Sequence, residues 1–295
     1  MRNFFVRRAI GTIIIIALVG GGFFIFYFFQ NKKENRNEEE LIETQNSILK
    51  QETIGFSVEK RKIEAYTFGQ GEKHLLFVGG IHGGYEWNSV MLAYKFIDYL
   101  EANPEIIPDN LTITVIPSAN PDGIFAVTDK DGRFNITDIP SSEATVIGRF
   151  NANEVDLNRN FDCKWQPEST WRNQPVSAGT EAFSEPEAQA IRNFVLEKPP
   201  VAVIFWHSQS NAVYASECKN GVLPETIKIM NTYAEVSGYP AIATFDSYEV
   251  TGDAEGWLAS INIPAITVEL KTHETIEWEQ NLAGIKALLN YYKEK

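Results

Sequence analysis

The chain has 295 residues, with 26 Lys and Arg against 39 Asp and Glu, which gives a formal net charge of −13. A protein this acidic lacks the clustered basic side chains that bind phosphate, so we expect no nucleic-acid partner. Two cysteines exclude a disulfide-dense scaffold and a cysteine-rich zinc module. A metal site would therefore have to use carboxylates and the four histidines.

The amino-terminal part of the sequence contains one long apolar run. Residues 9–29 read AIGTIIIIALVGGGFFIFYFF and carry no charged side chain. A helix of this length can cross a hydrocarbon core of about 30 Å. After a short tail at 1–8, we expect a single-pass transmembrane signal anchor in the cell membrane, with the rest of the chain outside the cytoplasm. A cleaved signal peptide is the alternative, although no small-residue cleavage site follows the run.

The rest of the sequence predicts a linker and one domain. Residues 30–53 are charged and polar, which indicates a solvated linker, and 54–295 show no second linker. The predicted elements are a strand pair around Glu59–Arg61, a strand at 74–80, a helix at 87–100, a strand at 111–117, a capping box at 184–187 that opens a helix through Leu196, strands at 201–206 and 265–270, and a helix at 276–292. This alternation predicts an α/β fold, with a mainly parallel, mixed and twisted sheet covered by helices on both faces.

Polar side chains with metal-binding chemistry follow the predicted strands. His82 and Glu86 come after one strand, His207 follows a second, and Glu269 lies near the end of a third. A His–Glu pair with a distant His is a typical ligand set of catalytic zinc, which keeps one position for water. A carboxylate off the metal, such as Glu269, is suited to act as general base toward that water. Because ligands bind beyond the carboxyl ends of parallel strands, we expect the four side chains to lie together.

Six segments carry a resemblance to a known family. In chain order they are GGIHGGYEWN, NPDG at 120–123, VDLNRNF at 155–161, FSEPEAQA at 183–190, FWHS at 205–208 and ITVEL at 266–270. With them the sequence resembles the carboxypeptidase A-like zinc metallocarboxypeptidases over nearly all of 54–295. The resemblance implies that family's fold and one Zn²⁺ per chain. It also implies that His82, Glu86 and His207 bind the zinc and that Glu269 is the general base and acid.

The resemblance also implies how a substrate is held. Asp156 matches the acid that orients the first histidine ligand. Asn158 and Arg159 match the pair that binds the terminal carboxylate of a peptide, and a planar guanidinium suits this task because it bonds both oxygens. Tyr248 matches a mobile tyrosine that closes over the substrate.

Two further roles are less direct. The family uses an arginine to stabilise the oxyanion of the tetrahedral intermediate. We assign this role to Arg149, which is close to Asn158 in the sequence, with Arg133 as the alternative. Glu255 lies two residues before Trp257, where relatives place the floor of the side-chain pocket. An acid there predicts a preference for a terminal Lys, Arg or diamino acid, and a surface position for Glu255 is the alternative.

The sequence departs from the family pattern at two places. The family's first ligand pair is usually His-x-x-Glu, whereas three residues separate His82 from Glu86 here. Gly83 and Gly84 permit the unusual turn that this spacing requires. Gln209 stands where many relatives have tyrosine, which changes part of the substrate pocket.

The two cysteines are expected to form a disulfide. Cys163 and Cys218 lie in a domain that we expect to be exported, where paired cysteines are the rule. A catalytic pair of Cys163 with His207 is the less favoured interpretation, because it leaves Glu86 and Glu269 without a role.

These observations predict a membrane-anchored, monomeric, extracytoplasmic zinc carboxypeptidase. It would remove a C-terminal amino acid from a peptide or from a cell-wall peptide. A murein-peptide amidase or an N-acyl amino acid deacylase of the same zinc family is the alternative. A non-catalytic binding module is disfavoured because neither a zinc ligand nor Glu269 is missing.

Overall fold

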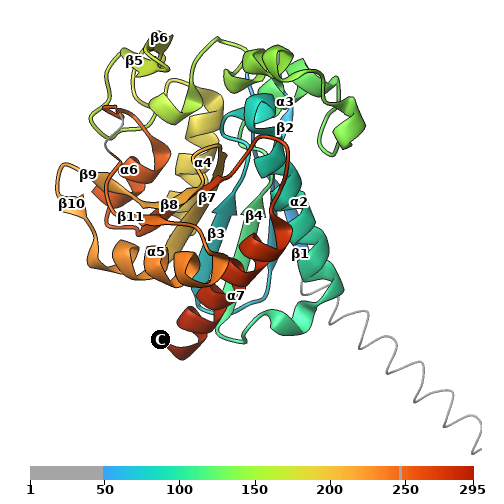
Figure 1. Ribbon diagram of the computed structural model, residues 1–295, viewed down its shortest axis with the longest axis vertical. Helices are drawn as coiled ribbons and strands as arrows, with labels where there is room; N and C mark the ends of the chain where they lie inside the picture. The colour runs from blue at the N-terminus through green and yellow to red at the C-terminus, as the bar shows by residue number, and fades with distance from the viewer. Residues whose placement is uncertain (1–48, 246–247) are drawn as a thin grey trace, which may run out of the picture. The chain divides into compact units, whose positions relative to one another are not determined.

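The structure is a computed structural model that describes residues 49–245 and 248–295 (Figure 1). The predicted tail at 1–8, the predicted membrane segment at 9–29 and most of the predicted linker lie outside these residues. Within the described ranges, none of the helices is both long and apolar enough to cross a membrane.

A central eight-stranded sheet organises the domain. Its spatial order is β1-β2-β4-β3-β7-β12-β8-β11. The four middle strands β4, β3, β7 and β12 run parallel, and antiparallel pairs join β1 to β2, β2 to β4, and β12 to β8. The strands are β1 Leu49–Phe56, β2 Lys62–Phe68, β3 Lys73–Val78, β4 Leu111–Ile116, β7 Ala202–Ser208, β8 Ala212–Ala215, β11 Ala241–Ile242 and β12 Ala265–Leu270. The prediction of a mixed, mainly parallel sheet within an α/β fold is confirmed.

Helices pack on both faces of the sheet (Figure 1). One apolar core joins the sheet to α2, α5 and α7, and a second joins it to α4 and α6. The helices are α2 Trp87–Ala102, α3 Pro121–Thr128, α4 Pro186–Glu197, α5 Pro224–Ser237, α6 Ala254–Ser260 and α7 Trp278–Glu294. Strand β7 is buried along its whole length, which explains its unbroken apolar sequence before His207.

Two small hairpins extend from this domain. Strands β5, Glu168–Trp171, and β6, Gln174–Ser177, form one of them. Strands β9, Glu217–Cys218, and β10, Gly221–Val222, form the other. The predicted disulfide between Cys163 and Cys218 is present and ties the second hairpin to the segment that follows Arg159.

The structure corrects two local predictions. Strand β1 begins at Leu49, so residues 49–53 belong to the sheet and not to the linker. Residues 50–53 are polar, as suits an edge strand, and Glu52 pairs with Lys50 of the same strand and with Lys198 at the end of α4. The predicted capping box at the start of α4 does not form, because the N-cap residue is Glu185 and no side chain caps it.

Candidate active site

The turn after β3 places the first two candidate metal ligands. His82 precedes a 3₁₀ turn, Gly83–Glu86, that leads directly into α2. Gly83 has a φ of +43°, and a Cβ at this position would lie 2.5 Å from the carbonyl oxygen of Gly148. Only glycine fits this backbone without displacing its neighbour. The turn thereby accommodates the additional residue of the His-x-x-x-Glu spacing and brings both side chains to one place.

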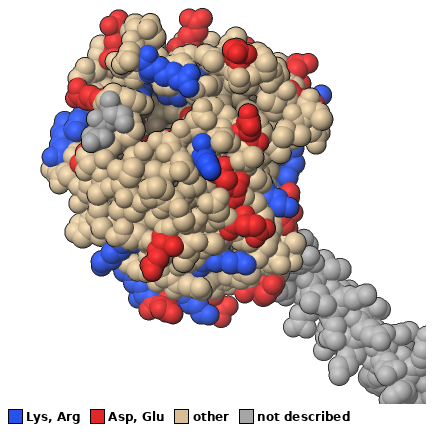
Figure 2. Space-filling view, in the orientation of Figure 1, with Lys and Arg blue, Asp and Glu red and all other residues tan. Residues whose placement is uncertain are grey.

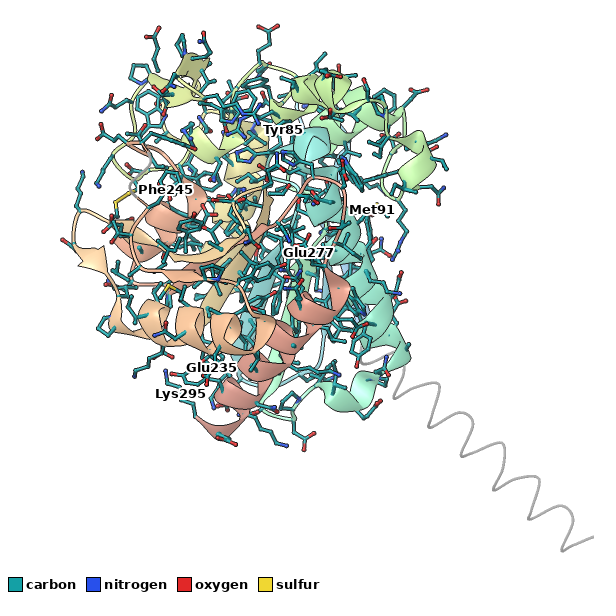
Figure 3. The ribbon with its side chains drawn as sticks, viewed as in Figure 1. Tyr85, Met91, Glu235, Phe245, Glu277 and Lys295 are labelled. Atoms are coloured by element: carbon teal, nitrogen blue, oxygen red, sulfur yellow. A yellow bond between two sulfur atoms is a disulfide. The ribbon has the colours of Figure 1, made fainter. Side chains whose placement is uncertain are left out.

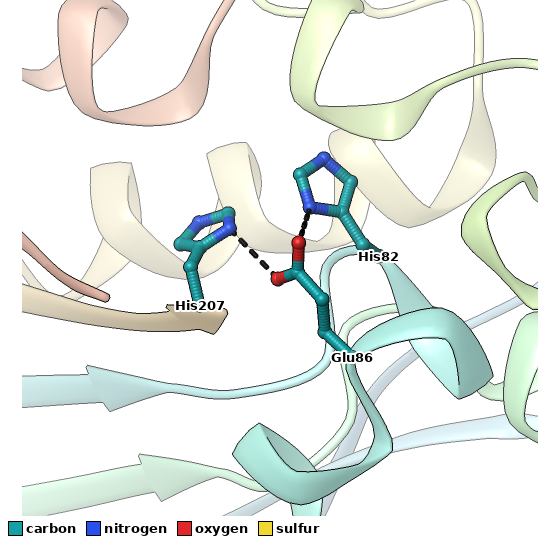
Figure 4. Close-up of side chains that lie close together, drawn as sticks. All are labelled: His82, Glu86 and His207. Carbon is teal, nitrogen blue, oxygen red and sulfur yellow. Dashed lines mark hydrogen bonds and ion pairs between the residues drawn. The ribbon is translucent and has the colours of Figure 1, made fainter. Parts of the chain in front are cut away.

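His207 completes a buried triad with His82 and Glu86 (Figure 4). The Glu86 carboxylate lies between the imidazoles, with Oε1 at 2.8 Å from Nδ1 of His82 and Oε2 at 3.0 Å from Nδ1 of His207. One ligand atom from each residue lies within 4.8 Å of the others. The sequence prediction that these three residues converge is confirmed.

Each histidine of the triad has a carboxylate beside its second ring nitrogen. Nε2 of His82 lies 3.3 Å from Oδ1 of Asp156, and Nε2 of His207 lies 3.1 Å from Oε1 of Glu255. Burial lowers the pKa of His207, but the charges of Glu86 and Glu255 outweigh this effect and raise the pKa well above its ordinary value. Burial raises the pKa of Asp156, and the charges of nearby basic groups more than reverse this, so that its carboxylate stays ionised.

Glu269 lies beside the triad because of strand register. In the parallel pairing of β12 with β7, Glu269 is opposite His207. The Glu269 side chain lines the cleft, and its Oε2 is shielded from solvent without a hydrogen-bond partner among the described residues. Burial, followed by the charge of Glu86, raises the pKa of Glu269 to about 8.

Two predicted substrate-binding residues lie in a short 3₁₀ turn, Leu157–Arg159, that follows Asp156. The Asn158 side-chain oxygen accepts a hydrogen bond from the backbone nitrogen of Ala254, which orients its amide. Arg159 donates from Nη1 to the backbone oxygen of Asn158 at 2.6 Å. Its Nε is buried and has no hydrogen-bond partner in the described part of the chain. An unpaired guanidinium nitrogen of this kind can receive an anionic group.

The two arginines considered for the oxyanion role have different surroundings. Arg149 is buried and donates from Nε and Nη2 to Oδ2 of Asp156, at 3.0 and 2.8 Å. Its Nη1 lies 3.8 Å from Oε1 of Glu86, at the triad. Arg133 is half exposed, pairs with Asp98 and does not line the cleft. The geometry therefore supports Arg149 over Arg133.

The triad opens into a cleft of about 570 Å³. Figure 2 shows a hollow in the upper part of one face with basic side chains at its edge, and Figure 3 places Tyr85 and Phe245, both cleft-lining residues, in the same part of the view. Of the ten predicted site residues, Asp156 does not line the cleft and lies instead against Nε2 of His82. The other nine line the cleft: His82, Glu86, Arg149, Asn158, Arg159, His207, Tyr248, Glu255 and Glu269.

Comparison with known proteins agrees with this geometry. The model of the zinc carboxypeptidase family matches residues 35–283, which is most of the chain. The chain belongs to the zinc carboxypeptidase family. Its members are zinc enzymes, and the family resemblance predicted from the six sequence segments is confirmed.

Individual relatives are more distant. The chain is 28% identical to gamma-D-glutamyl-L-diamino acid endopeptidase 1 of Lysinibacillus sphaericus, over 78% of this chain and 62% of that protein. It is 32% identical to carboxypeptidase B of Astacus astacus, over 50% of this chain and 49% of that protein. The chain thus spans less than two thirds of the length of both relatives.

Solved structures share the fold. Thrombin activatable fibrinolysis inhibitor matches 87% of this chain and 72% of its own, with a TM-score of 0.68 and 19% identity. Murein-tripeptide amidase MpaA from Escherichia coli O157 matches 82% of this chain and 91% of its own, with a TM-score of 0.56 and 22% identity.

The triad fits the zinc of this family. Oε2 of Glu86 is buried and has no hydrogen-bond partner among the described residues, although Nδ1 of His207 is 3.0 Å away. A divalent cation between Glu86 and the two Nδ1 atoms would satisfy these groups, and two imidazoles with one carboxylate are a common ligand set for catalytic zinc.

Some cleft residues had no signal in the sequence. Trp171 and Arg172, at the tip of the β5–β6 hairpin, line the cleft and contact Tyr85. No motif marks this hairpin. Asp253 also lines the cleft and caps α6 through the backbone nitrogen of Gly256. A helix N-cap pattern at Asp253 could have located it, but not its position in the cleft.

Proposed function

We propose that this chain is a zinc carboxypeptidase that removes a C-terminal amino acid from peptides outside the cytoplasm. One observation carries the proposal. The zinc triad, a carboxylate suited to proton transfer and a buried arginine with an unpaired Nε line one cleft. A carboxypeptidase needs a metal site, a group that transfers protons and a group that binds the terminal carboxylate, all close to the last peptide bond of the substrate.

The residues of the cleft divide the reaction between them. Asn158 and Arg159 bind the terminal carboxylate of the peptide, and Tyr248 closes over it. Zinc, when bound, polarises the scissile carbonyl and lowers the pKa of water. Glu269 takes a proton from the attacking water and returns it to the leaving amine nitrogen. Arg149 stabilises the negative charge that develops on the carbonyl oxygen, through the Nη1 that it does not use for Asp156.

Zinc held by the triad would also change the pKa of Glu269. In the metal-free protein the charge of Glu86 contributes to the raised pKa of Glu269. A divalent cation held by Glu86 would offset that charge and lower the pKa of Glu269, which favours the ionised carboxylate that a general base requires.

The side-chain preference is the least constrained part of the proposal. Glu255 and Asp253 line the same cleft as Asn158 and Arg159. Two acids in a confined cleft favour a terminal residue with a basic group, such as Lys, Arg or a diamino acid.

A murein peptide is the second candidate substrate. The gamma-D-glutamyl-L-diamino acid endopeptidase and the murein-tripeptide amidase among the relatives act, by their names, on bonds to diamino acids or on murein peptides. The two acids of the cleft suit the amino group of a diamino acid equally well. An N-acyl amino acid deacylase is less well supported, because neither of these two relatives is named for that activity.

The decisive experiment compares free and blocked peptide ends. Zinc-loaded protein is incubated with peptides ending in each amino acid, as free acids and as C-terminal amides, and with murein peptide fragments. Mass spectrometry reads the products, and Glu269→Gln serves as the control for contaminating peptidase. Loss of one residue from the free acids alone supports the carboxypeptidase. Cleavage of murein fragments alone supports the second candidate, and no cleavage of any substrate refutes both.

We further propose that residues 9–29 anchor a monomer in the membrane, with the catalytic domain outside the cytoplasm. The disulfide between Cys163 and Cys218 supports this location, because such bonds persist in oxidising compartments. Fractionation of cells that express the full chain tests the anchor. Release of the protein by salt or in soluble form would contradict it.

A further inference from the structure

Glu255 makes a contact that a substrate-binding acid does not require. Its Oε1 lies 3.1 Å from Nε2 of His207, in hydrogen-bond geometry, and the hydroxyl of Thr267 donates to the same oxygen at 3.1 Å. Glu255 and His207 are 3% and 2% exposed. The carboxylate is therefore held between a zinc ligand and the neighbouring strand β12.

This contact selects the ring orientation and the tautomer of His207. The Nδ1 atom faces Glu86 and must keep its lone pair free for a metal. The neutral imidazole then carries its proton on Nε2, which donates to Glu255. An acceptor at this place favours the tautomer that binds metal, and it prevents the ring from rotating away.

The two histidines of the triad have similar but not identical surroundings. His82 also presents Nδ1 to Glu86, and its Nε2 lies 3.3 Å from Asp156. Nε2 of His82, however, has no hydrogen-bond partner among the described residues, whereas Nε2 of His207 has one in Glu255. Of the two contacts between a histidine Nε2 and a carboxylate, only the one between His207 and Glu255 has hydrogen-bond geometry.

We propose that Glu255 is a positioning residue that holds His207 for the zinc ion, and that this role is separate from any contact with the substrate side chain. The carboxylate lies behind the ligand as Asp156 does behind His82. The inference rests on the family's zinc and on this geometry, and it does not require the proposed peptide substrate.

Zinc affinity, measured without substrate, tests the proposal. The apparent dissociation constant is obtained by competition with a chromophoric chelator for the parent protein and for Glu255→Met, whose side chain has similar size but no carboxylate oxygen and only a weak acceptor in its thioether sulfur. Loss of a contact of this kind typically weakens metal binding about 10- to 100-fold. Glu255→Gln keeps a neutral acceptor for Nε2, so we expect a smaller loss of about 3- to 10-fold, since hydrogen bonds to a charged acceptor are roughly twice as strong.

Two further measurements distinguish a local effect on His207 from a general loss of negative charge in the cleft. Glu249→Gln removes one negative charge from the exposed edge of the same cleft and should leave zinc affinity unchanged. The visible spectrum of the Co²⁺-substituted protein should change in Glu255→Met, because the ligand geometry changes. If Glu255→Met does not fold, as judged by circular dichroism, the Glu255→Gln value alone decides.

The outcomes separate the two roles of Glu255. Weaker zinc binding, with an equal fall of kcat/KM for peptides ending in Lys and in Leu, supports positioning. Unchanged zinc affinity in Glu255→Gln, with KM raised only for peptides ending in Lys, would overturn the proposal and leave Glu255 as a pocket acid. A chain that binds zinc as expected but cleaves no peptide would refute the proposed function and leave this inference intact.

Discussion

Gly83 provides the sharpest test of how the chain builds its metal site. A Cβ added there would lie 2.5 Å from the carbonyl oxygen of Gly148 and 2.9 Å from Cα of Gly123. The φ of +43° adds the penalty of a left-handed backbone, roughly 1–2 kcal/mol, and overpacking against backbone atoms adds about 1–3 kcal/mol. For Gly83→Ala we therefore expect a loss of about 2–5 kcal/mol in the free energy of unfolding. Urea unfolding of the metal-free protein measures it.

The same substitution should weaken zinc binding. The strain is relieved by a shift of the turn between His82 and Glu86, and zinc binding must reverse that shift. If only about 1.4 kcal/mol of the strain reappears on binding, the zinc dissociation constant rises tenfold. Chelator competition measures this change.

Gly238→Ala is the matched control. Gly238 has a φ of +77° at the end of α5, and a Cβ there meets no atom within 4 Å. We expect it to cost about 1 kcal/mol of stability and to leave zinc affinity unchanged. Equal effects of Gly83→Ala and Gly238→Ala on both quantities would show that the close approach to Gly148 plays no part in the metal site.

Three more predictions concern catalysis, stability and pH. Glu269→Gln should lower kcat by about 10²–10⁴ and leave zinc affinity near the parent value, and near-normal kcat would remove Glu269 from the mechanism. The Cys163–Cys218 bond closes a separation of 55 residues, so its reduction should lower the free energy of unfolding by about 4 kcal/mol, and identical urea unfolding with and without reductant would contradict this. In the metal-free protein the raised pKa values of His207 and Glu269 keep protons on both groups near neutral pH. Zinc binding would displace these protons, so the apparent zinc affinity should rise with pH through the neutral range, by up to tenfold per pH unit for each proton displaced. A flat profile between pH 6 and 8 would be inconsistent with those pKa shifts.

The metal triad and the position of Glu269 beside it could be predicted from the sequence. Each residue follows a short apolar segment, and parallel strands must deliver such residues to the same edge of a sheet. His207 and Glu269 illustrate this, because their predicted strands pair in register and place them side by side. The disulfide was also predictable, since the chain has only two cysteines.

The contact between Glu255 and His207 could not be predicted in this way. It joins Glu255 in α6 to His207 in β7, which are 48 residues apart in the chain. No local sequence pattern indicates which side chain contacts the Nε2 atom of a histidine. The sequence placed Glu255 near the substrate but not against a ligand. The choice between Arg149 and Arg133 likewise depended on the tertiary structure, because both are isolated arginines in the sequence and only packing shows that Arg149 is buried against Asp156.

The sequence by itself determined the alternation of elements, the metal ligands and the family. These features depend on periodicity and on residues that one strand or turn presents at its end. Tertiary structure alone decided that β1 begins at Leu49, in a polar stretch that resembles a linker in the sequence. It also decided that residues of the β5–β6 hairpin line the cleft. The physical reason is that such features arise from pairing and packing between segments distant in the chain, and the free energy of these contacts leaves no local pattern in the sequence.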